Sequence, residues 1–381
     1  MEYRLGQICK FQSGGTPAKG NPEYFNGNIP WITTTALNGS EINDHDAVDW
    51  ITEKAINESA AKIVPANSIM VGTRVGVGKV AINKVPMSTS QDIISLLDIA
   101  EDKWDKDYLC KLIQANHAFL NSQARGATIK GIKIDVLAAL KVPEIPLEKQ
   151  RKVSDVINKT RGIIDQRRKE LERLDELIKA RFVELFGDIV LNPIGYKEST
   201  VAEYCQMTQG TQIPMSEQIS EYKEGYYRYL YIRDLKYEDE NWIYVLNQYD
   251  EKKLTEDDLV VVNTGNTAGE IYRGKDGILS NNLFKVSFDT EILSTTYLYY
   301  YFGSDAFQKM LWSEMKEGTQ PHLGHKIFGS KKLLVPPMAI QEQFSNFVKK
   351  VDKSKVVVQK ALDETQTLFD SLMQEYFGKK I

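Results

Sequence analysis

The sequence predicts an α+β protein in which two tandem, mixed α/β globular domains are joined by two long antiparallel coiled-coil helices, with pseudo-two-fold symmetry. Two observations carry this prediction. The second half of the chain repeats the first at an offset of roughly 190 residues, and each half ends in a long segment with a heptad pattern. The expected boundaries are residues 1–146 for the first globular domain, 147–190 for the first long helix, 191–339 for the second globular domain and 340–381 for the second long helix.

The repeat rests on short matches that keep the same order in both halves. The clearest joins Leu140–Pro143 to Leu333–Pro336, and we also expect Tyr3 to correspond to Tyr196. Any single match is weak, but their shared order is not. A period this long is too long for a solenoid and indicates two copies of one domain.

Each half ends in an amphipathic segment that starts after Pro146 or Pro337. Apolar residues recur there at alternating spacings of about three and four, which is typical of a coiled-coil seam. The alternative is a helix that packs on its own globular domain. We favour the pair because each segment has one narrow apolar stripe and dense charge elsewhere, and connectivity then makes the two helices antiparallel. The expected seam residues are Val153, Ile157, Ile164, Leu171, Leu174, Ile178, Leu185, Phe344, Val348, Val351, Val358, Leu362, Phe369, Leu372 and Tyr376.

Within each globular part, short β-type runs alternate with glycine turns, and a helical stretch follows. The expected strands are Ser68–Thr73, Lys79–Ile82, Ile93–Ile99, Leu259–Asn263 and Ile278–Phe288, and the expected helical stretches are Tyr108–Ser122 and Thr296–Met315.

Composition excludes several classes of protein. The 48 Lys and Arg residues against 52 Asp and Glu residues give a net charge of -4, which rules out a strongly basic nucleic-acid coat but not a local basic surface. The longest apolar stretches, such as Tyr297–Phe302, are too short to span a membrane, and the first residues lack the apolar core of a secretory signal. Three widely spaced cysteines, Cys9, Cys110 and Cys205, fit free thiols in a reducing cytosol.

No catalytic constellation stands out. The segment Gly72–Lys79 imitates a phosphate-binding loop but fails its spacing, so a strand–turn–strand is expected instead. His322 and His325 form a possible half of a metal site, but no cysteine or further histidine lies nearby in the sequence, so we predict no metal.

Polar side chains recur at matched positions in the two halves. Amides and arginine read base edges in the major groove, while Lys, Ser and Thr hold phosphates. At any one position the alternative is a solvated loop residue. A shared scaffold with unlike polar side chains favours two domains that read two unlike DNA half-sites. The candidate DNA-binding residues are Thr33, Thr34, Thr35, Arg74, Lys79, Ser90, Gln91, Asp92, Arg125, Thr128, Lys130, Tyr231, Arg233, Asn266, Asn281, Asn282, Lys316, Gln320 and His322.

The sequence resembles the specificity subunit of type I restriction–modification systems over essentially its whole length. The resemblance is carried by Tyr3–Pro17 (YRLGQICKFQSGGTP) and by the matched helix starts Val142–Gln150 and Val335–Gln343. It implies that the globular parts are target-recognition domains that each read half of a bipartite site in double-stranded DNA. It also implies that the helices act as a spacer, and that this chain has no catalysis and no cofactor of its own.

The resemblance further implies partners. These are two methyltransferase subunits that use S-adenosylmethionine to make N6-methyladenine, and restriction subunits that cleave and translocate DNA with ATP and Mg²⁺. It implies a prokaryotic cytoplasmic, nucleoid-associated protein with no membrane partner, and it leaves a homodimer of the isolated chain open. From the residues alone, a coiled-coil assembly scaffold whose globular parts bind protein remains the alternative. A nucleotide-dependent DNA-modifying enzyme is a third reading, which the missing motifs disfavour.

Overall fold

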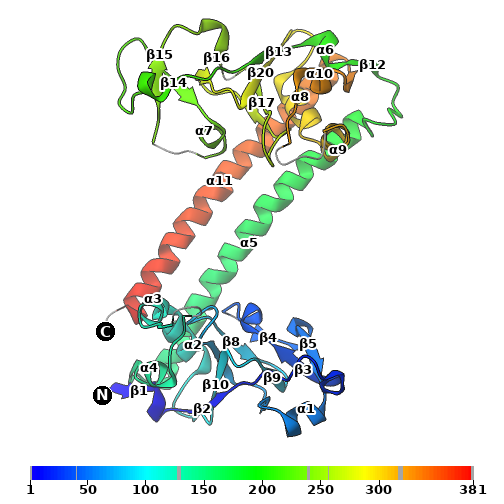
Figure 1. Ribbon diagram of the computed structural model, residues 1–381. Coiled ribbons are helices and arrows are strands. Elements are labelled where there is room, and N and C mark those ends of the chain that lie inside the picture. The colour runs from blue at the N-terminus through cyan, green and yellow to red at the C-terminus, as the bar shows by residue number, and fades with distance from the viewer. Residues whose placement is uncertain are drawn as a thin grey trace. The chain divides into compact units, whose positions relative to one another are not determined.

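The computed structural model describes residues 2–39, 41–126, 130–237, 241–255, 257–315 and 321–378. The chain divides into two compact units, Met1–Arg168 with Lys360–Ile381 (unit 1) and Lys169–Gln359 (unit 2). Each unit therefore holds one globular part and roughly half of each long helix. We call the globular parts head 1 (residues 2–146) and head 2 (residues 187–337), and both are seen in Figure 1.

The described residues of head 1 form three sheets. In strand order they are β2 (Lys10–Ser13), β10 (Ile93–Leu97), β7 (Ile69–Gly72), β8 (Val80–Asn83) and β4 (Glu41–Ile42); then β5 (Asp49–Ile51), β3 (Phe25–Ile32), β9 (Met87–Thr89) and β6 (Ile63–Val64); and β1 (Glu2–Arg4) with β11 (Lys141–Pro143). The helices are α1 (Glu53–Glu58), α2 (Lys106–Ala115), α3 (His117–Ser122) and α4 (Ile134–Ala138), with short 3-10 turns η1 (Leu5–Gln7), η2 (Pro22–Tyr24), η3 (Thr34–Ala36) and η4 (Asp44–Asp46).

Head 2 repeats this plan. Its sheets are β13 (Cys205–Gln209), β20 (Leu283–Phe288), β17 (Leu259–Val262) and β18 (Ile271–Arg273); β15 (Tyr244–Leu246), β14 (Tyr226–Leu230), β19 (Gly277–Leu279) and β16 (Lys253–Leu254); and β12 (Lys197–Thr200) with β21 (Lys332–Val335). Its helices are α6 (Val201–Tyr204), α7 (Ile232–Lys236), α8 (Thr295–Phe302), α9 (Asp305–Trp312) and α10 (His325–Gly329), with 3-10 turns η5 (Met215–Glu217) and η6 (Asp250–Lys252).

Strands β7 and β17 are buried at every position, because both faces of their sheets are covered. In β7, Ile69 and Val71 join the core that contains α2, whereas Met70 joins a separate core between the two larger sheets. In β17, Val261 and Val260 are divided between two cores in the same way. The expected strand–turn–strand over Gly72–Lys79 is confirmed, since β7 and β8 form an antiparallel pair.

The predicted repeat is confirmed, but its register at the start is corrected. The Leu5 N–H donates to the carbonyl just before β11 at 2.9 Å, and the Val201 N–H makes the same 2.9 Å bond just before β21. Leu5 therefore corresponds to Val201 and Leu140 to Lys331, so the predicted match of Leu140–Pro143 with Leu333–Pro336 is wrong by two residues. Tyr3 then corresponds to Ser199, so its predicted match with Tyr196 is wrong.

Three further predictions need correction. The expected single strand Ile278–Phe288 is wrong, because the chain turns at Ser280–Asn282 and places β19 and β20 in different sheets. The expected helix Thr296–Met315 is divided into α8 and α9 because the Ser304 side chain caps a new helix. Tyr108–Ser122 is likewise divided, with the break at Asn116.

The two long helices are α5 (Leu147–Phe186) and α11 (Met338–Phe377), each of 40 residues. Within each unit, their contacts run in antiparallel order. In unit 2 the ring of Phe182 lies 5.5 Å from that of Phe344, and Lys355 forms an ion pair with Asp175. In unit 1 the Arg161 guanidinium lies 5.4 Å from the centroid of the Phe369 ring. No described helix combines the length and apolar character needed to cross a membrane.

The helix stripe is buried, but not only by the helix pair. Among the predicted seam residues, the structure buries Val153, Ile157, Ile164, Ile178, Phe344, Val348, Val351 and Val358, and half-buries Leu171, Leu174, Leu185, Leu362, Phe369, Leu372 and Tyr376. The packing on the chain's own globular parts, which the sequence analysis disfavoured, is real at the helix ends. Val153 and Ile157 belong to the core of head 1, and Ile178 belongs to that of head 2. Phe182 and Phe186, which the predicted seam left out, are buried there as well.

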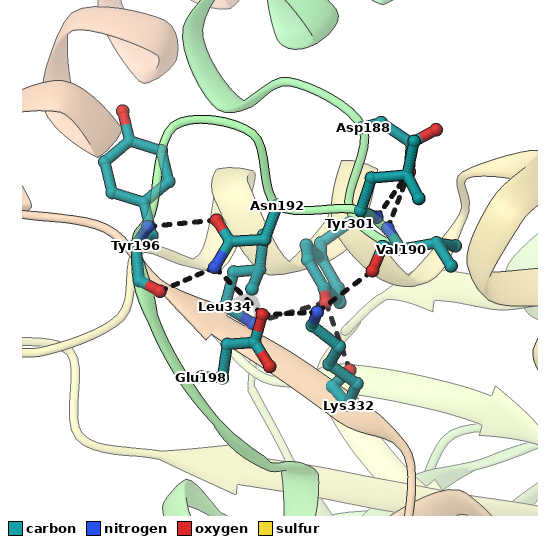
Figure 2. A network of polar contacts seen from close by, with 9 residues as sticks. Asp188, Val190, Asn192, Tyr196, Glu198, Tyr301, Lys332 and Leu334 are labelled. Carbon is teal, nitrogen blue, oxygen red and sulfur yellow. Dashed lines mark hydrogen bonds and ion pairs between the residues drawn. The ribbon is translucent and has the colours of Figure 1, made fainter.

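A polar network fixes the path of the chain from α5 into head 2 (Figure 2). The Asp188 carboxylate accepts a hydrogen bond from the Val190 N–H at 2.7 Å, directly after the helix. The Lys332 ammonium on β21 donates to the Val190 carbonyl at 3.0 Å and lies 2.5 Å from the Glu198 carboxylate. The Asn192 side chain also donates to Glu198, at 3.0 Å. The direction of this connection is therefore set by side chains within unit 2.

Candidate nucleic-acid interface

In head 1, the turn Ser90–Asp92 between β9 and β10 holds three predicted residues, and backbone hydrogen bonds tie this turn region to four other segments. The bonds run from Gly14 N to Ile93 O (3.0 Å), Gly15 N to Thr89 O (2.9 Å), Ser90 N to Ile32 O (2.9 Å), Thr73 N to Asp92 O (2.8 Å) and Ile132 N to Thr73 O (2.7 Å). Segments far apart in the sequence are thus assembled into one loop cluster, which we call tip 1.

Head 2 builds the same cluster, tip 2, around Ser280–Asn282. Its bonds run from Gly210 N to Leu283 O (2.9 Å), Thr211 N to Leu279 O (2.9 Å), Ser280 N to Leu230 O (3.0 Å), Asn263 N to Asn282 O (3.1 Å) and Leu323 N to Asn263 O (2.8 Å). All five match the bonds of tip 1 position for position. The frame uses main-chain groups only, so it does not depend on the side chains that the turn presents.

Each tip needs one glycine for close approach of two backbones. A Cβ on Gly14 would lie 2.3 Å from the Ser90 carbonyl oxygen, and a Cβ on Gly210 would lie 2.0 Å from that of Ser280. Neither distance is possible for a real side chain. The two glycines are therefore part of the frame.

The predicted residues of head 1 differ in exposure. Thr34 and Ser90 are buried, at 5% and 4% exposure, so their hydroxyls face the protein. Thr33 and Thr35 share a hydrogen bond of 2.8 Å between their hydroxyls. The exposed predicted side chains of this head are Thr35, Arg74, Lys79, Gln91, Arg125 and Lys130, and Thr128 lies outside the described residues.

Tip 1 brings cationic and amide groups close together. The Arg74 guanidinium lies 3.7 Å from the half-buried Asp92 carboxylate. Arg125 pairs with Gly131, and Gly131 packs against the side chain of Arg74. The Gln91 side chain is exposed on the turn beside them. This arrangement suits phosphate contacts from the arginines and base-edge contacts from the amide.

Tip 2 presents a different set of side chains. Asn281, Asn282, Asn266 and His322 are exposed, and the Thr264 hydroxyl lies 3.4 Å from the His322 ring nitrogen. Lys316 and Gln320 lie outside the described residues. Two amides thus stand where tip 1 has an amide and a carboxylate.

A second predicted group of head 2 lies at the end of β14. The guanidinium of Arg233 lies 5.6 Å from the centroid of the Tyr231 ring, and its Nε lies 3.7 Å from Asp234. The Tyr231 hydroxyl donates to the Gln218 side chain at 3.1 Å. Tyr231 and Arg233 come shortly after Leu230, whose carbonyl accepts the hydrogen bond from the Ser280 N–H in tip 2.

Sequence reasoning missed two cation–aromatic pairs on the β14–β15 sheet. One pair lies on each face, because Tyr227 and Arg228 are consecutive residues of β14. The Arg228 guanidinium lies 3.9 Å from the centroid of the Trp242 ring, and the Lys253 ammonium lies 4.3 Å from that of Tyr227. The run of five tyrosines between Tyr222 and Tyr231, interrupted by Lys and Arg, was the available signal. Stacked cation–aromatic pairs hold side chains in fixed positions at a protein surface.

His322 and His325 do not come together as one metal site. His322 contacts Thr264, whereas the His325 Nε2 lies 3.1 Å from the Gln209 side-chain oxygen and its ring packs on Phe284 at 4.8 Å. Burial, followed by the positive charges of His322 and Lys252, lowers the pKa of His325 below its ordinary value. In the described part of the chain, no three His, Cys, Asp or Glu side chains are grouped to hold a metal.

Comparison with known proteins gives one consistent result. Residues 1–173 and 193–365 each match a family model described as the type I restriction modification DNA specificity domain. The chain is 24% identical to the MjaIX specificity subunit of Methanocaldococcus jannaschii, over 99% of this chain and 92% of that protein. It is 28% identical to the EcoR124I/EcoR124II specificity subunit of Escherichia coli over 49% of this chain and 47% of that protein.

Two solved structures share the fold. One is the S subunit of a type I restriction-modification system from M. genitalium, with a TM-score of 0.60 at 14% identity, covering 100% of this chain and 96% of that one. The other comes from work on complex assembly and conformational transition of the type I R-M system. Its TM-score is 0.63 at 15% identity, with 99% and 97% of the two chains covered.

Proposed function

Because this chain belongs to the family of type I restriction–modification DNA specificity subunits, we propose that its heads select the DNA sequence on which the complex acts. Each head reads one half of a bipartite site in the major groove of double-stranded DNA. In this proposal residues 1–146 and 191–339 are the two target-recognition domains, and residues 147–190 and 340–381 are the spacer helices.

One observation carries the proposal: tips 1 and 2 share a main-chain frame but present different side chains. Gln91 and Asp92 stand in tip 1 where Asn281 and Asn282 stand in tip 2. A glutamine or asparagine amide can bind adenine through two hydrogen bonds, and a carboxylate can accept one from cytosine. Two equivalent frames with unlike side chains are suited to two unlike half-sites.

The long helices support a role as spacer. A helix of 40 residues is about 60 Å long, which corresponds to about 18 base pairs of DNA. Apolar side chains of α5 that the two units leave exposed also support partner docking. Val156, Ile163 and Leu177 are 41%, 45% and 47% exposed, and heptad spacing places them on one side of the helix. We propose that methyltransferase subunits dock there.

The partners follow from the family. We propose two methyltransferase subunits that carry S-adenosylmethionine and restriction subunits that use ATP and Mg²⁺, with no cofactor and no catalytic residue on this chain. Action on chromosomal DNA would place it in the cytoplasm of a prokaryote, at the nucleoid. Self-association of the isolated chain belongs to the same set of proposals.

The test is to express this chain with the methyltransferase subunit of its system and map N6-methyladenine across the genome. We expect methylation at a bipartite sequence that disappears when the gene for this chain is deleted. Replacing residues 1–146 with the corresponding part of another specificity subunit should change one half-site only. The matched exchange of residues 191–339 should change the other half-site. If neither exchange altered the methylated sequence, DNA readout by the heads would be refuted.

A further inference from the structure

Arg161 on α5 makes three separate contacts within unit 1, two with head 1 and one with α11. Its Nη1 donates to the Gly39 carbonyl at 2.8 Å, and its Nη2 donates to the Gln114 side-chain oxygen on α2 at 3.3 Å. Its guanidinium also lies 5.4 Å from the centroid of the Phe369 ring on α11. One side chain therefore joins both long helices to the head.

The loop that contains Gly39 has a backbone conformation that leaves room for this contact. Gly39 has a φ of +85°, a conformation that favours glycine. A Cβ at this position would lie 2.3 Å from the Gln114 side chain and 3.0 Å from the Arg161 guanidinium. The Gln114 side chain donates to the same Gly39 carbonyl at 3.2 Å. Two side chains, one from α5 and one from α2, thus converge on a single carbonyl oxygen.

That carbonyl is close in sequence to the residues proposed to meet DNA. Gly39 follows η3 (Thr34–Ala36) by three residues, and its own N–H donates to the Val80 carbonyl at 2.8 Å. Val80 directly follows Lys79, which ends the loop between β7 and β8. This loop begins at Thr73, a residue of tip 1. Movement of the Arg161 guanidinium against head 1 would therefore act on both segments.

Head 2 has no arginine at the corresponding position. The equivalent glutamines Gln150 and Gln341 fix the register of the two helices against their heads, and this register places Asp352 where α5 has Arg161. Asp352 is exposed. A carboxylate cannot donate to a carbonyl, so Asp352 cannot make the contact that Arg161 makes in unit 1.

We propose that Arg161 is a positioning residue that fixes the angle between α5 and tip 1, and thereby restricts the spacer length that the complex accepts on the side of head 1. This inference rests on the proposed function. A guanidinium that holds a carbonyl and an amide at once is stiffer than a single hydrogen bond, because its planar fork fixes both directions. Its loss would leave the side chains of tip 1 unchanged but would free the Gly39 loop, and the segments bonded to it, to shift against α5.

The experiment uses the methyltransferase complex with plasmids that carry the wild-type site, the same half-sites with the spacer changed by one base pair, and sites with either half altered. The variant is Arg161→Met, which keeps an unbranched apolar stem but removes the guanidinium and both donors. We expect methylation of the altered-spacer plasmids to rise about tenfold relative to the wild-type site, the change that 1.4 kcal/mol makes in an equilibrium constant. Both half-sites should still be required.

The matched control is Arg181→Met. Arg181 also lies on α5 and over a ring of α11, 5.8 Å from the centroid of Phe347, but its Nη1 pairs with Glu184 on its own helix. We expect wild-type spacer selectivity from this variant. Arg161→Lys, which supplies one donor nitrogen in place of the two that Arg161 uses, should give an intermediate value. Thermal unfolding of each variant in the complex would show that the fold is intact.

The outcomes separate the two proposals. Unchanged spacer selectivity in Arg161→Met, or equal loss in Arg161→Met and Arg181→Met, would overturn the positioning role while leaving the proposed function standing. A wild-type complex that methylates no bipartite sequence would overturn the proposed function and this inference together. If Arg161→Met unfolded, Gln114→Leu, which removes the second partner of Gly39, should produce the same loss of selectivity, and its failure to do so would also overturn the inference.

Discussion

Gln150 and Gln341 make the same three hydrogen bonds at equivalent positions of the two long helices. The Gln150 side chain accepts from the Asp105 N–H at 2.9 Å and donates to two carbonyls, both at 2.9 Å. The Gln341 side chain accepts from the Ser294 N–H at 2.8 Å and donates to two carbonyls at 2.8 and 3.0 Å. Both side chains are 0% exposed. Since Asp105 and Ser294 cap the first helix after the central sheet in each head, each glutamine locks a long helix to its own head.

Removing either glutamine should destabilise the unit that contains it. We expect Gln150→Leu and Gln341→Leu each to lower the free energy of unfolding by about 3 kcal/mol, because three buried partners lose their hydrogen bonds. The measurement is urea unfolding followed by circular dichroism. Gln166→Leu is the control, since Gln166 is exposed on the same helix as Gln150 and should change stability by less than about 0.5 kcal/mol. Equal effects from Gln150→Leu and Gln166→Leu would contradict the role given to Gln150.

The two tips should be separable by single substitutions. Gln91→Ala should weaken methylation at sites with the correct first half by about tenfold, since one bidentate base contact is worth about 1–3 kcal/mol. Asn281→Ala should do the same for the second half. Each variant serves as the control for the other, because both side chains are exposed and neither substitution alters the main-chain frame. The readout is the methylation rate on a panel of sites altered in one half at a time. Two variants that affected the same half-site would disprove the assignment.

A paired deletion in the long helices should shorten the spacer. Removing Gln166–Glu172 from α5 and Val358–Glu364 from α11 takes one heptad from each and keeps the antiparallel order of their contacts. Seven helical residues span about 10 Å, so we expect the preferred spacer to shorten by about three base pairs. Genome-wide mapping of N6-methyladenine would show whether both half-sites survive. Deletion from α5 alone breaks the pairing of the two helices and should abolish methylation. An unchanged spacer length after the paired deletion would refute the proposal that the helices set this length.

The stability of head 2 should depend on pH through His325. Burial lowers the pKa of this ring below its ordinary value of 6.5, so the folded state disfavours the proton that the unfolded chain accepts. The stabilisation is therefore complete above pH 6.5 and is lost as the pH falls through the folded pKa. We expect wild-type protein to be less stable at about pH 5.5 than at about pH 7.5, and His325→Phe, which keeps the ring against Phe284, to show a smaller difference. An NMR titration that placed the pKa of His325 at or above 6.5 would contradict this explanation.

The repeat and the long helices could be predicted because each leaves a regular pattern in the order of residues along the chain. Heptad spacing and the prolines before α5 and α11 are read directly from the chain. That the ends of the long helices also pack into the cores of the heads was not predictable in this way. Ile157 occupies a seam position by spacing, yet the structure buries it in the core of head 1. Periodicity indicates which side of a helix is apolar, but not which neighbour covers it.

The tips show where sequence reasoning stops. The sequence predicts polar reading positions at Gln91 and Asp92 and at Asn281 and Asn282, but it places the second pair inside one strand because apolar residues flank it on both sides. The bonds that assemble each tip, such as Gly14 to Ile93 and Thr73 to Asp92, join residues far apart in the chain. Burial of Thr34 and Ser90 follows from those bonds and from no property of the residues themselves.

The frame of each tip is made of peptide groups, so substitutions at positions 91, 92, 281 and 282 leave its hydrogen bonds in place. A gene for this protein can therefore accumulate such substitutions without loss of the fold. A new preference in one head need not disturb the other, so changes in the two halves multiply the number of sequences a lineage can sample. The positions that cannot drift are Gly14 and Gly210, where any larger residue would close the space that the turn needs.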